Sequence, residues 1–196
     1  LLEEGVGVAD LFLPDGAAIL ETRGRAPGQN QEFRAVNAEM VPGLPVVVLV
    51  NERSASASEI VAGALQDHDR ALVIGNRTYG KGSVQTLFPL SGGNRLRLTT
   101  ARWYTPVGRS IQIVRDEEAE DGAAVSLALG LDGQRVLHGA PEELPTVQSL
   151  GGRTIYGGGG ITPDLVVLPD TMSSGEQTAV QRLFRLGSVF TTASFD

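Results

Sequence analysis

The chain has 196 residues, of which 41% are hydrophobic and 20% are charged, with a net charge of −7 and no cysteine. This length and composition predict a globular protein with one large domain or two small ones. The absence of a basic block argues against nucleic-acid partners, no apolar run approaches the ~18 residues of a membrane-spanning helix, and the lack of cysteine excludes disulfides and thiolate catalysis.

The first part of the chain predicts a helix, a strand and a loop. Residues 1–12 have apolar positions at helical spacing, but neither an initiator methionine nor an N-cap precedes them. We therefore expect that something upstream is missing. Residues 17–21 predict a short strand, residues 24–32 a polar loop, and residues 36–40 are ambiguous.

A strand–helix–strand unit follows. Residues 46–50 are a continuous apolar run, which predicts a buried strand of parallel type. Residues 57–66 predict a helix with apolar residues on one face, and residues 71–75 predict a second strand. This alternation favours an α/β fold.

The rest of the chain predicts mainly β-structure. Residues 84–105 predict strands on both sides of a turn at 91–94, and in the second of them apolar and polar positions alternate, as in a half-buried hairpin partner. Further along, the pattern predicts an acidic loop, a glycine-rich loop, a strand and an amphipathic helix, at residues 116–122, 157–164, 165–168 and 173–190.

Three serines lie where the first strand of this unit turns into the helix. They are Ser54, Ser56 and Ser58. A hydroxyl at such a turn can be exposed beside backbone N–H groups that stabilise an anion. Serine is also a favoured N-cap residue, so a structural role for all three stays open.

Lys81 is the second candidate for chemistry. It stands between Gly80 and Gly82 just after the second strand, with no acidic residue near it in sequence to hold its charge. A lysine acts as a base only when neutral, and burial among apolar groups favours that form. A surface lysine in a loop is the alternative interpretation. A serine and a lysine in these places are the layout of a Ser-Lys hydrolase.

Nucleotide binding fits the chain less well. Residues 75–82 nearly match a P-loop, but Gly82 stands where a hydroxyl would bind Mg²⁺, and β-like residues follow it. The glycines at 157–160 suggest a dinucleotide site, but Pro163 interrupts the helix that would have to follow.

Zinc and penicillin-binding-type sites fit equally poorly. His68 and His138 have neither a cysteine nor an H-E-x-x-H motif beside them. No serine lies three residues before Lys81, so the S-x-x-K motif is absent. We expect neither a metal nor an organic cofactor.

Taken together, these segments resemble the C-terminal processing peptidases, also called tail-specific proteases. The resemblance rests on S-A-S-A-S-E-I, A-G-A-L-Q-D and T-Y-G-K-G-S-V-Q, and on the later W-Y-T-P-V-G-R-S-I-Q and Y-G-G-G-G-I-T-P-D. It covers nearly the whole chain. It implies a serine endopeptidase that cleaves protein or peptide substrates with apolar C-termini near that end, through an acyl-enzyme and without cofactors. It also implies an extracytoplasmic location, such as the bacterial periplasm or cell envelope.

The resemblance assigns roles to individual residues. The nucleophile falls on Ser56, the base on Lys81, and the glutamine that orients the base on Gln85. The N–H of Ala57 is the oxyanion donor that this chain retains. Two further acidic residues are candidates for supporting roles, with structural roles equally open: Glu59 and Asp67.

The implied fold is an α/β core of the crotonase/Clp protease-like type, with a mixed sheet and a strand–helix–strand unit around the nucleophile. Residues 1–196 would be the peptidase core, truncated at its N-terminus, without the family's PDZ domain and the strand ending in N-x-P-G-G. That strand supplies a second oxyanion donor, worth typically about 10²–10³ in rate, so we expect the isolated chain to be inactive or impaired. The open strand position predicts a homo-oligomer. A non-catalytic binding protein on the same scaffold is the alternative.

Overall fold

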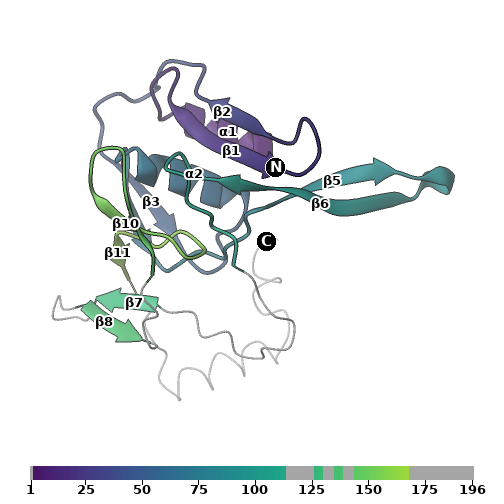
Figure 1. The fold of residues 1–196 in the computed structure, drawn as a ribbon. Coiled ribbons are helices and arrows are strands. Elements are labelled where there is room, and N and C mark those ends of the chain that lie inside the picture. Colours follow the sequence, from purple (N-terminus) through teal and green to yellow (C-terminus); the bar gives the residue numbers. More distant parts are fainter. Residues whose placement is uncertain (1, 114–125, 130–134, 139–143, 168–196) are drawn as a thin grey trace, which may run out of the picture.

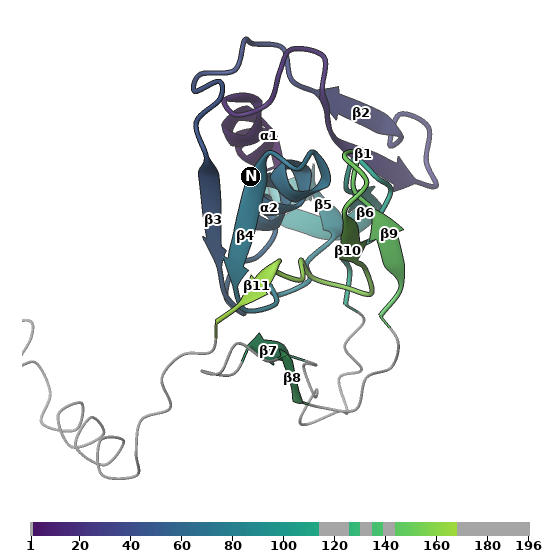
Figure 2. The ribbon, with the colours of Figure 1, turned by 90° about the vertical axis from the view of Figure 1, so that its left-hand side faces the viewer.

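The computed structural model describes residues 2–113, 126–129, 135–138 and 144–167 of the chain. The described part has a mixed α/β architecture, as the sequence predicts, with two α-helices, α1 (Leu2–Asp10) and α2 (Ala57–Asp67). Figures 1 and 2 show α2 near the centre of the molecule, with strands on both sides of it.

A parallel sheet holds the strand–helix–strand unit. Its order is β11-β4-β3, from β3 (Val46–Val50), β4 (Ala71–Gly75) and β11 (Leu165–Val166). β3 and β4 pair in parallel register, which requires a crossover between them, and α2 is that crossover. Gly75 has a φ of +129°, and a Cβ there would lie 1.9 Å from the carbonyl oxygen of Val50. Glycine therefore lets the ends of the two strands approach.

An antiparallel sheet packs on the other side of α2. Its order is β2-β1-β6-β5, from β1 (Ala18–Gly24), β2 (Gln31–Arg34), β5 (Ser83–Pro89) and β6 (Arg95–Tyr104). A short 3₁₀ turn, η1 (Ser91–Gly93), joins β5 to β6. Two small antiparallel pairs complete the described strands: β7 (Ser126–Leu129) with β8 (Arg135–His138), and β9 (Thr146–Gln148) with β10 (Thr154–Tyr156).

The core surrounds α2, which contacts α1, β1 and β4. α2 buries eight of its eleven residues, five of them apolar or small and three polar: Glu59, Gln66 and Asp67. Small side chains permit the close packing: a Cβ on Gly63 would lie 3.0 Å from Ile161. The largest fully buried apolar side chains include Trp103, Leu13, Ile19, Leu20, Ile60, Leu65, Ile111, Ile155 and Ile161.

Two sequence-based interpretations of burial are wrong. The predicted buried strand, β3, is covered on one face only: Val46 and Val48 pack against the hydrophobic core, whereas Val47 and Leu49 are 53% and 77% exposed. The predicted half-buried hairpin projects from the body in Figure 1, so Leu96 and Leu98 of β6 are exposed. The alternation of apolar and polar residues predicted which side chains share a face of a strand. It did not predict whether another element packs on that face.

Other predictions concern element boundaries. The helix at the start of the chain, both strands of the unit and the helix between them are confirmed. The predicted polar loop at 24–32 is wrong at its end, because β2 begins at Gln31 and pairs with β1. The ambiguous segment 36–40 forms neither a helix nor a strand. The predicted acidic loop at 116–122 and helix at 173–190 lie outside the described residues.

Candidate active site

Ser56 stands at the turn between β3 and α2 and is the N-cap of that helix. Its backbone has φ 57° and ψ −113°, in a region that residues with a side chain rarely adopt. A conformation of this kind costs on the order of 1–3 kcal/mol and persists only where the surroundings enforce it. The structure thus singles out the middle serine of the three as the strained one.

Glu59, one turn into α2, explains how this turn is held. Its side chain is completely buried and accepts four hydrogen bonds. Oε2 accepts from the backbone N–H groups of Ser56 at 2.8 Å and Lys81 at 2.9 Å. Oε1 accepts from the hydroxyl of Thr78 at 2.5 Å and the N–H of Gly80 at 2.6 Å. A buried carboxylate is costly unless such donors satisfy it, and here four do so.

One carboxylate therefore joins the serine turn to the loop that carries Lys81. A direct backbone hydrogen bond adds a second link, from the N–H of Tyr79 to the carbonyl of Ser54 at 2.9 Å. The serine turn and the lysine loop are far apart in sequence, and these two links hold them together. Glu59 is the sequence-predicted supporting residue that the structure places at the site.

The glycines beside Lys81 are required by close packing. Gly80 has a φ of +81°, and a Cβ there would lie 2.4 Å from Cγ1 of Ile113. The N–H of Ile113 donates to the carbonyl of Gly80 at 3.0 Å, and the N–H of Gly82 donates to Oε1 of Gln112 at 3.0 Å. The segment after β6 thus supports the lysine loop from behind.

The glycine-rich loop at 157–160 packs against the same loop. Gly160 has a φ of +64°, and a Cβ there would lie 2.6 Å from the carbonyl oxygen of Thr78. The N–H of Ile161 donates to Oγ1 of Thr78 at 2.6 Å. Arg77 donates to the carbonyls of Gly158 and Gly159, and burial lowers the pKa of its guanidinium. A chain of contacts therefore runs from this loop through Thr78 to Glu59.

Ser56, Lys81 and Gln85 line one cavity of about 590 Å³. Ile60 and Trp103 form part of its apolar wall, and the indole N–H of Trp103 donates to the carbonyl of Lys81 at 3.3 Å. The pairing of β5 with β6 shifts register between Val84 and Gln85. Such an irregularity re-aims side chains, and both of these residues line the cavity.

Ala57 is the first residue of α2, directly after Ser56. Its N–H is one of the four at a helix start that have no acceptor within the helix, at the positive end of the helix dipole. α1 packs closely here, because a Cβ on Gly5 would lie 3.0 Å from the carbonyl oxygen of Ala57. The predicted oxyanion donor therefore stands beside the strained serine.

Asp67 lies at the other end of α2. It is eleven residues beyond Ser56, which corresponds to about 16 Å along the helix. Its fully buried carboxylate forms an ion pair with Arg109, itself 4% exposed, and accepts a hydrogen bond from the N–H of Val107 at 2.9 Å. Arg109 also donates to the carbonyl of Tyr156 at 2.8 Å and to Gln66 at 3.0 Å.

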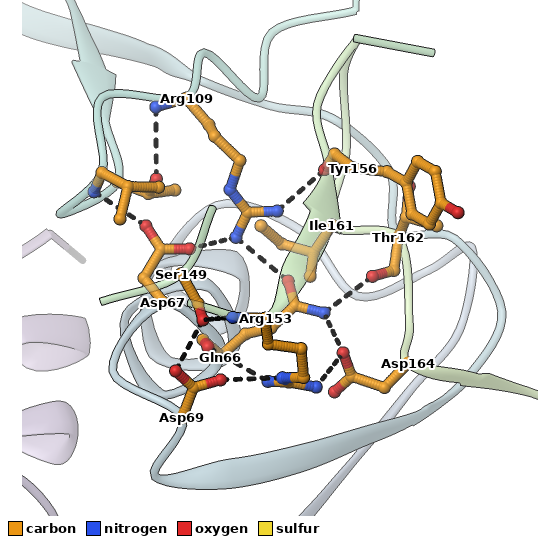
Figure 3. Close-up of polar contacts among 12 residues, drawn as sticks. Gln66, Asp67, Asp69, Arg109, Ser149, Arg153, Tyr156, Ile161, Thr162 and Asp164 are labelled. Atoms are coloured by element: carbon orange, nitrogen blue, oxygen red, sulfur yellow. Dashed lines mark hydrogen bonds and ion pairs between the residues drawn. The ribbon is translucent and has the colours of Figure 1, made fainter. Parts of the chain in front are cut away.

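Figure 3 shows that this pair belongs to a polar network that anchors the end of α2. Arg153 bridges the carboxylates of Asp69 and Asp164, and Gln66 donates to Asp164 at 3.0 Å. Burial raises the pKa of Asp69, but hydrogen bonds from Ser149, Arg153 and the N–H of Gly151 outweigh it and hold that pKa below its usual value. The structure does not bring Asp67 to the serine and lysine.

Sequence reasoning missed three features of the site. Thr78 lies in the quoted T-Y-G-K-G segment, but nothing about a threonine in a turn indicated that it would be buried against Glu59. The S-x-x-E spacing of Ser56 and Glu59 is a capping-box signature and could have indicated their contact. The positive φ of Ser56 left no local signal, because serine does not favour it.

In the described ranges, no group of three or more His, Cys, Asp and Glu side chains could hold a metal ion. Among the same residues, no helix is long and apolar enough to cross a membrane.

The chain is similar in sequence to known peptidases. Residues 1–118 match the sequence model described as peptidase family S41. The chain is 53% identical over 112 residues to a carboxy-terminal-processing protease of Bartonella bacilliformis, covering 57% of this chain and 26% of that protein. It is 45% identical over 123 residues to a carboxyl-terminal-processing protease of Synechocystis, covering 61% and 28%.

A solved structure shows the same relationship. The photosystem II D1 C-terminal processing protease matches with a TM-score of 0.57 and 27% identity, covering 88% of this chain and 33% of that one. The chain thus spans about a quarter to a third of the length of these relatives. Because the family model matches more than half of the chain, the chain belongs to peptidase family S41.

Proposed function

We propose that this chain carries the catalytic centre of a serine endopeptidase that cleaves proteins near their C-terminus, with Ser56 as nucleophile and Lys81 as base. The observation that carries the proposal is the shared carboxylate of Glu59, which binds the backbone N–H of both residues. The relatives named as C-terminal processing proteases supply the substrate class. The parallel β3–α2–β4 unit around Ser56 supports a core of the crotonase/Clp type.

The proposed reaction has two halves. Neutral Lys81 removes the proton from the Ser56 hydroxyl as its oxygen attacks a peptide carbonyl, and the N–H of Ala57 stabilises the resulting oxyanion. Protonated Lys81 then gives the proton to the leaving amine, which leaves an ester on Ser56. Water hydrolyses this ester, with Lys81 again accepting and returning the proton.

Gln85 and Glu59 have positioning roles in this proposal. Gln85 lines the same cavity as Lys81 and orients its amine. Glu59 holds the backbone of both reacting residues and takes no part in proton transfer. An extracytoplasmic location belongs to the same proposal, and a chain without cysteine is compatible with an oxidising compartment.

Serine-to-alanine variants of the intact protein test the proposal. Ser56→Ala should abolish cleavage of a peptide substrate, whereas Ser54→Ala and Ser58→Ala, its matched neighbours, should retain it. Lys81→Arg keeps the positive charge but cannot deprotonate near neutral pH, so it should also be inactive. Full activity of Ser56→Ala, or substantial turnover by Lys81→Arg, would reject the assigned roles. Peptide binding without any cleavage by the wild type would favour the binding-protein alternative.

A further inference from the structure

The cavity at Ser56 extends beyond the residues used in the proposed reaction. It continues onto the hairpin of β5 and β6, where Leu87 and Arg97 line it. These two residues face each other in the register of the two strands, so their side chains lie on the same face. The hairpin that carries both residues projects from the body in Figure 1.

The guanidinium of Arg97 has no ionic partner in the part of the chain that the structure describes. Five other arginines in the described part of the chain form ion pairs with carboxylates: Arg23, Arg34, Arg70, Arg109 and Arg153. Among the described residues, the side chain of Arg97 forms no ion pair or hydrogen bond. A guanidinium presents several N–H donors in a planar fork that matches a carboxylate.

The other charged groups of the cavity do not neutralise Arg97. They are Glu3 and Lys81. Glu3 belongs to α1 in the body of the molecule, whereas Arg97 belongs to the projecting hairpin. Lys81 is itself basic and cannot neutralise a guanidinium, so Arg97 is the cation that lines the hairpin part of the cavity.

The spacing along β5 suits an extended peptide. β5 is an edge strand of its sheet, so an extended chain can lie along it. Gln85 and Leu87 are two residues apart, about 6.7 Å in a strand. A peptide residue beside Leu87 and Arg97 would therefore lie about two positions beyond the residue beside Gln85.

We propose that Arg97 is a specificity residue that binds a carboxylate of the substrate. Leu87 contacts apolar atoms in the same part of the substrate. The carboxylate is either the substrate's free C-terminus or an acidic side chain. This inference rests on the proposed function, because it places the substrate in the cavity that contains Ser56.

Fluorescence of Trp103 provides a binding assay that does not depend on catalysis. Trp103 is the single tryptophan of the chain and lines the cavity. The 196-residue chain carrying Ser56→Ala is titrated with a short apolar peptide that has either a free C-terminal carboxylate or an amide. A second pair of amidated peptides carries Glu or Gln at one internal position. The peptide pair whose two members bind with different Kd values identifies the source of the carboxylate.

The substitution Arg97→Gln should raise the Kd of the carboxylate-bearing peptide about three- to tenfold and leave the neutral peptide unchanged, because an exposed charge pair contributes modestly. Raising the salt concentration should shrink the difference. Arg95→Gln is the matched control, since Arg95 lies on the same strand, is exposed and does not line the cavity. It should change neither Kd.

The role of Arg97 would be overturned if Arg97→Gln raised the Kd of neutral and carboxylate-bearing peptides equally. The same effect from Arg95→Gln would also overturn it. Wild-type cleavage without any preference for a carboxylate would overturn it too and leave the proposed function standing. Carboxylate-dependent binding in a protein that cleaves nothing would support Arg97 and refute the peptidase. Absence of binding by every peptide would reject a peptide site at Arg97.

Discussion

Replacing Glu59 with glutamine tests whether its carboxylate holds the serine and lysine segments together. The substitution preserves shape but turns one acceptor oxygen into an NH₂ group, which only donates. If the NH₂ replaces Oε2, the N–H groups of Ser56 and Lys81 both face a donor. If it replaces Oε1, the hydroxyl of Thr78 can rotate to accept, but the N–H of Gly80 is left without a partner. The second arrangement is the less costly one.

The magnitude follows from these bonds. An unsatisfied buried N–H costs about 1–3 kcal/mol, and each remaining bond weakens from a charged to a neutral acceptor by roughly 1 kcal/mol. A buried amide is cheaper to desolvate than a carboxylate, which offsets part of this loss. We therefore expect the free energy of unfolding to fall by on the order of 2–4 kcal/mol.

Urea denaturation followed by Trp103 fluorescence measures this loss, and a peptidase assay of the intact protein measures its effect on turnover. Glu52→Gln is the matched control, because Glu52 is exposed in the turn just before the serines. It should leave both quantities unchanged. If Glu59→Gln unfolds at the wild-type urea concentration and cleaves at the wild-type rate, Glu59 does not position Ser56 or Lys81.

Three further outcomes are expected. Asp67→Asn should lower the free energy of unfolding by about 3–5 kcal/mol, because it leaves Arg109 buried without its partner. The kcat of the folded protein should stay near wild type, because Asp67 is far from Ser56. A selective loss of kcat would give Asp67 a catalytic role. Burial raises the pKa of Asp10, but hydrogen bonds from Asn37 and the N–H of Val36 hold it below its usual value. The stability that Asp10 contributes is thus present above about pH 4 and is lost as pH falls through its lowered pKa. In denaturation at several pH values, Asp10→Asn should be less stable than wild type at pH 7 and converge with it in acid; a constant difference would contradict this. In light scattering, we expect self-association through the edge of β3, which pairs with one described strand only. Leu49→Lys should reduce this self-association, and Leu150→Lys, a control at another exposed leucine, should not. A monomer at all concentrations would refute the prediction.

Local patterns in the sequence were sufficient for the elements around the site. The apolar runs of β3 and β4 and the helical spacing of α2 each arise from a few neighbouring residues, so their type and order could be predicted. The candidate residues Ser56, Lys81 and Gln85 could be named because they belong to motifs of fixed spacing. The structure places all three on one cavity, and their catalytic roles stay a prediction.

The geometry of the site depended on contacts between distant segments. The positive φ of Ser56 is imposed by packing and by Glu59, because serine has no preference for that conformation. The link from Glu59 to Thr78 and Lys81 joins residues about twenty positions apart, which periodicity cannot reveal. Burial likewise depends on what packs against a strand. An apolar run such as β3 therefore determines a strand, but only its neighbours in three dimensions decide that Leu49 is exposed.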